Sequence, residues 1–114
     1  MEMETLIQHA NQKEDKISKI INSVLRQVFG EEATLLIYRY LEAKYSLRPD
    51  EVSDKIELFA KGLEEFLRSG AFVVERRILD DIYSSYGLLR RLELEQSHVE
   101  SDFVSQVRML MHKA

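Results

Sequence analysis

Glu95 and His98 are the residues whose types and spacing come closest to a metal site. A Glu-x-x-His spacing places a carboxylate and an imidazole on one face of a helix, and di-iron bundles combine two such motifs with two further glutamates. The chain contains a single Glu-x-x-His motif and no cysteine. Ordinary polarity of an exposed helix face explains this pair, so we expect no metal site and no cofactor.

Ser84 and Ser85 are candidates for a nucleophile. A serine needs a neighbouring base to remove its proton, and no histidine or lysine lies near this pair in the sequence. The chain also lacks a glycine-rich phosphate loop and an HExxH zinc motif. We therefore predict that the protein is not an enzyme.

Two basic pairs, Arg76-Arg77 and Arg90-Arg91, are candidates for contacts to nucleic acid. The formal net charge of the chain is −4, which is unfavourable for a protein that binds by neutralising phosphates. Arg76 and Arg77 each have an acid four residues later, Asp80 and Asp81, at the spacing of an ion pair within a helix. A solvated helix face is the favoured interpretation, and DNA binding through Arg76, Arg77, Arg90 and Arg91 is the alternative.

Glu75 stands out because the helical period places it among apolar residues. With Ala71 at 0° and about 100° per residue, Ile78 falls near 340°, Ile82 near 20° and Glu75 near 40°. A carboxylate facing a core must be protonated, paired or hydrogen-bonded, because an unpartnered charge there costs several kcal/mol. We therefore predict that Glu75 is a buried acid with a structural role.

The favoured role of Glu75 is a clamp between its helix and a neighbouring loop or helix. The candidate donors are Tyr38, Tyr40, Tyr45, Arg39, Arg26 and the backbone amides of residues 46–53. Two alternatives remain open. Glu75 could be an acid with a raised pKa in a small pocket, or a tilted helix could leave it at the rim of the core.

The elements that position these residues are predicted to be helices. The chain has 114 residues, 45% of them apolar, with one proline and four glycines. So few helix breakers, and apolar residues spaced three and four apart, predict a single all-α domain over residues 1–114 with about five helices. The helices are expected over residues 1–29, 31–45, 56–69, 71–86 and 88–112, with the first and last longer than the others.

Side-chain faces follow from the same period. On the second helix, Leu36 and Ile37 are expected to point inward, and on the third Gly62 falls on the polar side. Leu47 and Val52 are expected to hold the loop of residues 46–55 against the core. No apolar run approaches the ~18 residues of a membrane span, and the acidic start does not resemble a signal peptide, so a cytoplasmic protein is expected.

Residues 30–87 carry a pattern of apolar residues and glycines. The matching positions are Gly30, Ile37-Tyr38, Leu41-Glu42, Leu47, Pro49, Glu51-Val52, Phe59, Leu63-Glu64, Gly70-Ala71, Val74-Glu75, Ile78-Leu79, Tyr83 and Gly87. This stretch resembles the Nitrosopumilus output domain (NitrOD), an archaeal helical family of unknown biochemical function. The resemblance implies an archaeal regulatory or signal-output module, and it supplies no catalytic residues.

Apolar residues at the two ends of the chain suggest that it binds a second copy of itself. An apolar stripe over residues 88–111 fits a heptad, with glutamines 96 and 106 at polar seam positions that can fix register. In an up-down bundle the terminal helices, residues 1–29 and 88–112, would extend beyond the central unit of residues 31–86. A homodimer would cover these ends. The candidate interface residues are Leu89, Leu92, Val99, Phe103, Val107 and Leu110.

Together these features predict a non-catalytic protein-interaction or regulatory module that acts as a homodimer. The alternatives are a DNA-associated transcriptional regulator and a protein that binds an apolar ligand inside the bundle. Another protein is a possible partner, and nucleic acid is a less favoured one.

Overall fold

A long helix with a break at Gly30 opens the described part of the chain. The computed structural model describes residues 15–87 and 102–113, and helix α2 runs over Lys16–Tyr45. Asp15 caps its start, where Asp15 Oδ1 accepts a hydrogen bond of 2.7 Å from the Ser18 amide. Gly30 has φ 84° and ψ 176°, a conformation that favours glycine. The break that the sequence predicts at Gly30 is present, but the chain continues directly into the second half of α2.

Three further α-helices and two short 3₁₀ turns follow α2 in the described residues. They are η1 (Pro49–Glu51), α3 (Ile56–Leu67), η2 (Arg68–Gly70), α4 (Ala71–Ser85) and α6 (Phe103–Lys113). No strand occurs in these two ranges, so the all-α prediction is confirmed.

The predicted number of helices and the predicted length of the last helix are wrong. The described ranges hold four α-helices rather than five, because the expected helices 1–29 and 31–45 meet in one kinked α2. The last helix begins at Phe103 with 11 residues, against 15 in α4, so it is not the longer one. Asp102 starts it, since Asp102 Oδ2 accepts a hydrogen bond of 3.3 Å from the Ser105 amide, as an N-cap does. Residues 88–101 lie outside the described ranges.

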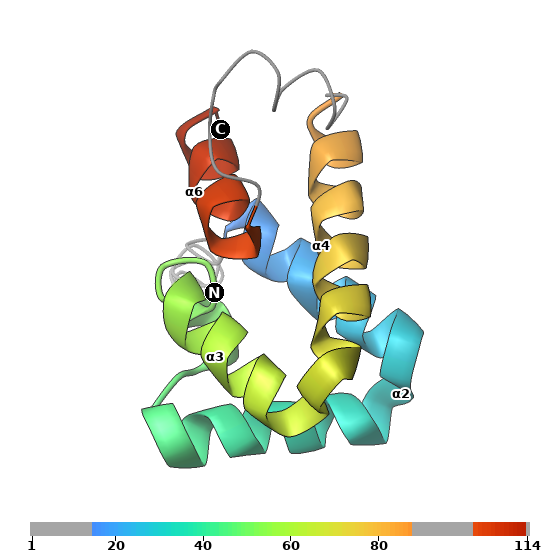
Figure 1. Cartoon of the computed structure of the whole chain (residues 1–114), viewed down its shortest axis with the longest axis vertical. Coiled ribbons are helices and arrows are strands. Elements are labelled where there is room, and N and C mark those ends of the chain that lie inside the picture. Colours follow the sequence, from blue (N-terminus) through green and yellow to red (C-terminus); the bar gives the residue numbers. More distant parts are fainter. Residues whose placement is uncertain (1–14, 88–101, 114) are drawn as a thin grey trace, which may run out of the picture.

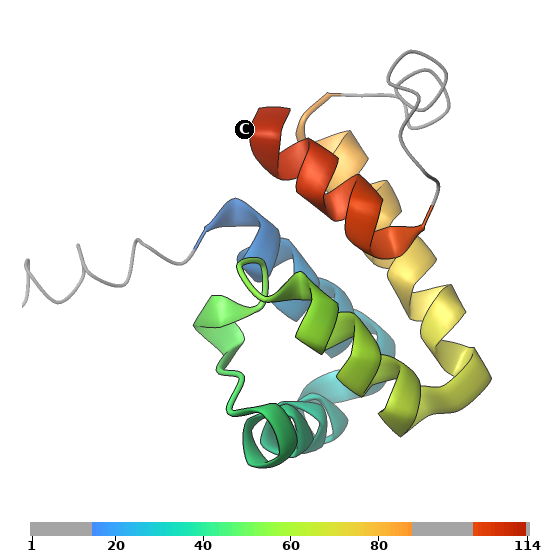
Figure 2. The ribbon, with the colours of Figure 1, turned by 60° about the vertical axis from the view of Figure 1, so that its left-hand side comes forward.

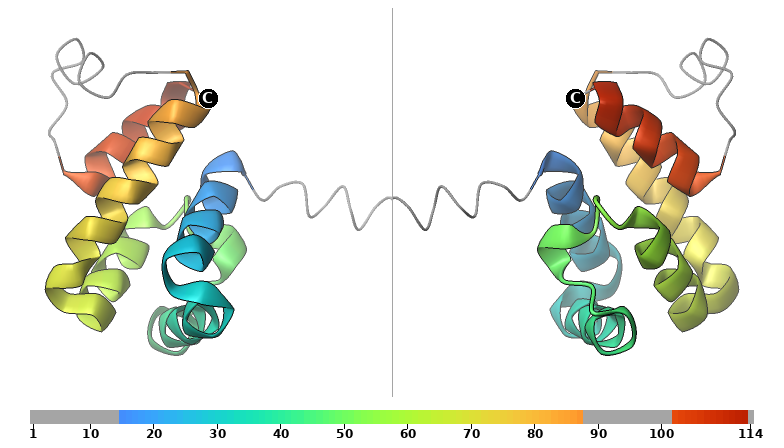
Figure 3. Two further views of the ribbon diagram at one scale, coloured as in Figure 1. Left: turned by 90° about the vertical axis from the view of Figure 1, so that its right-hand side faces the viewer. Right: turned by 90° about the vertical axis from the view of Figure 1, so that its left-hand side faces the viewer.

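The helices enclose one core (Figure 1). The second half of α2 lies across the end of the molecule where α3 leads through η2 into α4, and α2 packs against both α3 and α4. Helix α6 lies beside α4 and also contacts α3 (Figures 2 and 3). Helices α3, α4 and α6 therefore meet on the side of the core away from the kink in α2.

The core draws on all four helices and on the loop after α2. The loop prediction is confirmed, because Leu47 and Val52 are buried. The first half of α2 shares this core with α3 and α4. The fully buried large side chains are Tyr83, Phe59, Ile21, Leu25, Ile37, Leu41, Leu47, Ile56, Leu63, Ile78, Ile82 and Leu110.

Two residues, Leu36 and Gly62, face differently from what the sequence predicts. Leu36 is 53% exposed, while Ile37 and Tyr38 are buried. Gly62 is buried rather than on a polar side. A Cβ at Gly62 would overlap Leu41 Cδ2 and lie 3.2 Å from Tyr45 Cε2. Gly62 therefore allows close approach of α3 to α2.

Helix α6 is anchored in the core by apolar and polar contacts. Phe103, Val107 and Leu110 are buried within the single chain. The hydroxyl of Tyr83 on α4 donates a hydrogen bond of 3.1 Å to Oε1 of the buried Gln106. Gln106 therefore serves this chain's own core, and the three apolar residues are not exposed for the dimer seam to which they were assigned.

None of the helices within the described ranges is both long and apolar enough to cross a membrane.

Candidate functional site

Helix α4 turns Glu75 toward the interior, as its period predicts. Ala71, Ile78 and Ile82 are buried on the same face, and Glu75 is only 5% exposed. Phe72, by contrast, lies in the first turn of α4 and is 72% exposed. The predicted burial of Glu75 is confirmed.

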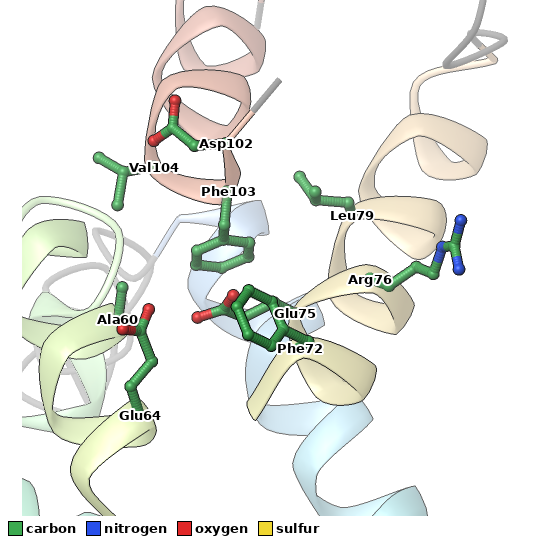
Figure 4. Close-up of a pocket in the computed structure, with 9 residues that line it drawn as sticks. All are labelled: Ala60, Glu64, Phe72, Glu75, Arg76, Leu79, Asp102, Phe103 and Val104. Atoms are coloured by element: carbon green, nitrogen blue, oxygen red, sulfur yellow. The ribbon is translucent and has the colours of Figure 1, made fainter. Parts of the chain in front are cut away.

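The groups around Glu75 are not those expected from the sequence. Its charged neighbours are Glu64 on α3 and Asp102 at the start of α6. The close-up shows the side chains of Glu75 and Glu64 directed toward one another, with Asp102 above them (Figure 4). Glu75 Oε2 is buried and accepts no hydrogen bond from the described part of the chain. The predicted clamp, with tyrosine, arginine or loop amide donors, is therefore wrong in its partners.

The expected donors are engaged elsewhere. The hydroxyls of Tyr45 and Tyr40 donate to Glu65 Oε1 at 2.6 and 3.1 Å, and the Lys44 ammonium lies 3.0 Å from the same oxygen. These hydrogen bonds lower the pKa of Glu65 to about 2, with that of Tyr45 the largest cause. Glu65, rather than Glu75, is the acid that joins α3 to α2 through hydrogen bonds from tyrosines.

The other proposed donors also have different partners or positions. The hydroxyl of Tyr38 donates to Asn22 Oδ1 at 3.0 Å, and Arg26 is paired with Glu31. In the loop, the Ser53 amide donates to Ser18 Oγ at 3.2 Å. The remaining candidate, Arg39, is exposed on α2 and lines a different cavity.

Burial and like charge act together on Glu75. Burial is the largest cause that raises its pKa, followed by the negative charge of Glu64, a hydrogen bond with the Glu64 carboxyl, and the charge of Asp102. The resulting pKa is about 7. The pKa of Asp102 moves the other way, because the Ser105 hydroxyl and amide hydrogen-bond to its carboxylate. Glu75 therefore keeps its proton to a higher pH than Asp102 does.

These carboxyl groups line a cavity of about 380 Å³ between α3, α4 and α6. The side chains of Phe72 and Phe103 contribute aromatic surface, and Glu75 points between them (Figure 4). Arg76 also lines the cavity, but its guanidinium points away from the carboxyls. The full lining is Ala60, Glu64, Phe72, Glu75, Arg76, Leu79, Asp102, Phe103 and Val104. The pocket alternative for Glu75 is thus the one that the structure supports.

The walls of the pocket suit a positively charged organic group. Within the described ranges, no group of three or more histidine, aspartate or glutamate side chains has a geometry that could hold a metal. The walls combine carboxyl groups with aromatic rings and the aliphatic side chain of Leu79. Such walls favour a cation that carries apolar surface.

The serine pair considered as a nucleophile is not brought to this pocket. Ser84 and Ser85 are exposed at the end of α4. Glu95, His98, Leu89, Leu92 and Val99 lie outside the described residues.

One basic candidate within the described ranges makes contacts with the chain's own side chains. Arg77 lies 3.5 Å from Asp81, as its spacing predicts, and donates to Gln27 Oε1 at 2.9 Å. A further basic side chain, Arg108 on α6, pairs with Glu57 at 2.7 Å. Arg90-Arg91 lie outside the described ranges. DNA binding stays a prediction, and the contacts of Arg77 and Arg108 give it no support.

Sequence reasoning missed Glu64 and Asp102 as parts of the site. The Asp102-Phe103-Val104-Ser105 order carries an N-cap signal that could have placed a helix start at Phe103. Glu64 gives no comparable signal, since it lies on the exposed side of α3 and approaches Glu75 only through packing.

Comparisons with known proteins do not add a name to this site. No family model matches the chain, and neither the curated proteins nor the solved structures contain a match. The resemblance to the Nitrosopumilus output domain therefore stays a prediction.

Proposed function

We propose that this protein is a non-catalytic interaction module with a regulatory role, and that it binds a positively charged group of a partner in the pocket between α3, α4 and α6. The observation that carries the proposal is the carboxyl of Glu75. It is buried in the wall of an open pocket, and Oε2 accepts no hydrogen bond from the described residues. A buried acceptor without a donor is unfavourable by about 1–3 kcal/mol, and a cationic donor in the pocket would remove that cost.

The charge around Glu75 supports the same occupant. Glu64 and Asp102 bring two further carboxyl groups to the pocket. Low-dielectric walls concentrate the field of such a cluster, so the pocket favours cations over neutral or anionic groups. The proposal does not involve a nucleophile or a metal.

Binding of a small organic cation tests the proposal. The probe is n-butylammonium, with n-butanol as a neutral control of similar shape, titrated while backbone amide signals are followed by NMR. We expect n-butylammonium to shift the amides of residues 60–64, 72–79 and 102–104, and n-butanol to leave them unchanged. Glu75→Gln should abolish these shifts, and Glu42→Gln, at an exposed position on α2, should retain them. Equal shifts with n-butanol would contradict the proposal.

The homodimer is a separate proposal. Its remaining candidate contacts are Leu89, Leu92 and Val99, because Phe103, Val107 and Leu110 are buried within the chain. Sedimentation velocity over a wide concentration range tests it. A monomer mass at every concentration would contradict it.

A further inference from the structure

The pocket contains features that distinguish one class of cation from others, and this inference rests on the proposed function above. We propose that its occupant is the guanidinium group of an arginine side chain from a partner protein, held between the carboxyl groups of Glu75 and Glu64. The aliphatic part of that side chain lies along Leu79 in the wall of the pocket and Phe72 at its mouth.

The two carboxyl groups suit a planar cation with several donors. Glu75 is on α4 and Glu64 on α3, and in Figure 4 they approach each other from opposite walls. A guanidinium has five N–H donors in a rigid plane and can donate to both walls at once. An ammonium is a compact, strongly hydrated charge that loses more hydration on entering an apolar-walled site. The arrangement therefore favours arginine over lysine.

The aromatic side chains point to the same cation. Phe103 is buried at one side of the pocket, whereas Phe72 is 72% exposed on the first turn of α4. Guanidinium groups stack on aromatic faces more readily than ammonium groups do. Leu79 adds apolar surface for methylene groups, which long basic side chains bury while their charge stays with polar partners.

The exposed Phe72 ring indicates a partner larger than a free guanidinium compound. A large apolar side chain at the mouth of a polar pocket would contact the residues on either side of an inserted arginine. Exposed aromatic residues beside a deep pocket are typical anchors of protein interfaces. We therefore assign the arginine to a protein chain.

The carboxyl of Glu75 must release its proton to form the ion pair. Glu64 on α3, Asp102 before α6 and Arg76 on α4 are the other charged groups that line this pocket. With the pKa of Glu75 at about 7, its ionised fraction rises about tenfold between pH 6 and pH 8. Arginine should accordingly bind about tenfold more tightly at pH 8 than at pH 6.

The experiment compares three capped peptides, acetyl-Gly-X-Gly-amide, in which X is arginine, lysine or the neutral analogue citrulline. A fourth probe, n-propylguanidinium, supplies the same group without a peptide. Affinities are measured by NMR titration at pH 6 and pH 8. We expect the arginine peptide to bind at least about tenfold more tightly than the citrulline peptide, as loss of a charge-assisted hydrogen bond implies. It should also bind several-fold more tightly than the lysine peptide and n-propylguanidinium.

Matched variants assign the effect to the pocket. Glu75→Gln should weaken arginine binding about tenfold at pH 8 and remove the dependence on pH. Phe72→Ala should reduce the advantage of the peptide over n-propylguanidinium, since Phe72 is exposed and its truncation leaves the core intact. Glu42→Gln should bind as the unaltered protein does. The amide spectrum of each variant establishes that it is folded.

The outcomes separate this inference from the function on which it rests. Equal affinity for the lysine and arginine peptides would overturn the assignment to arginine and leave the cation site standing. Equal affinity for n-propylguanidinium and the arginine peptide would overturn the assignment to a protein partner. Failure of every cation to bind, n-butylammonium included, would overturn both proposals.

Discussion

Replacing Glu75 by glutamine should stabilise the protein at neutral and alkaline pH. Glutamine has nearly the same shape, cannot become charged, and can donate a hydrogen bond to Glu64 across the pocket. The substitution removes a carboxyl that is buried beside two other acids. Most substitutions at buried positions destabilise a protein, so an increase in stability is a discriminating result.

The size of the effect follows from the pKa of Glu75. Its value is about 7 in the folded protein against 4.5 for the unperturbed group, so the folded state holds a proton that the unfolded state has lost between these pH values. Proton linkage then lowers the free energy of unfolding as pH rises through this window. The difference of 2.5 pKa units at 1.36 kcal/mol each gives an upper limit of about 3 kcal/mol above pH 7. Water in the open pocket reduces this figure.

The assay is urea denaturation of the unaltered protein and Glu75→Gln at pH 4.5, 5.5, 6.5 and 7.5. We expect the stability of the variant relative to the unaltered protein to increase steadily across this range, by up to about 1.4 kcal/mol per pH unit. Glu42→Gln, at an exposed position on α2, serves as the control and should show no such trend. The difference between two proteins cancels the titration of groups that they share.

One result would refute this account of Glu75. If Glu75→Gln were less stable than the unaltered protein at pH 7.5, the carboxylate would have favourable partners in the folded state. The clamp expected from the sequence would then be closer to the truth than the unpartnered acid in a pocket.

Three further predictions concern contacts within and between the helices outside the pocket. Glu65→Gln should lower the melting temperature at pH 7 and have little effect at pH 2. The pKa of Glu65 is depressed to about 2, so its carboxylate contributes stability above pH 4.5 that is lost as pH falls toward 2. Melting curves at both pH values check this. Gly62→Ala should destabilise by about 1–3 kcal/mol through overlap with the buried Leu41, whereas Gly30→Ala, with open space around it, should cost about 1–2 kcal/mol through its backbone alone. In denaturation experiments on a Leu41→Ala background, only the cost of Gly62→Ala should become smaller. Asp15→Ala should cost about 0.5–2 kcal/mol by removing the cap of α2, and an unchanged unfolding midpoint would show that the cap contributes nothing.

Short-range features of the fold were predictable because they depend on local chemistry. Gly30 breaks α2 since a left-handed backbone favours glycine. The apolar period of α4 placed Ile78 and Ile82 inward together with Glu75. Leu47 and Val52 were recognisable as the apolar residues that hold the only long loop in the described ranges.

Features that depend on two helices together were not predictable from one helix at a time. The close approach of Gly62 to Leu41 requires α3 and α2 to cross there. Tyr40 and Tyr45 could have reached either Glu65 or Glu75, and the crossing of α2 over α3 directed them to Glu65. A heptad over residues 88–111 suggested a dimer seam, but Asp102 begins a new helix whose apolar face the chain itself buries.

The sequence by itself determined that this chain forms helices, where α4 begins, and that Glu75 faces inward. These properties follow from the period of apolar residues and from glycine, which act within a single segment. Only the tertiary structure decided what Glu75 meets. Helices α3, α4 and α6 come together so that carboxyl groups, rather than donors, face it. The reason is that a side chain's burial follows from its own helix, while its partners follow from how separate helices pack.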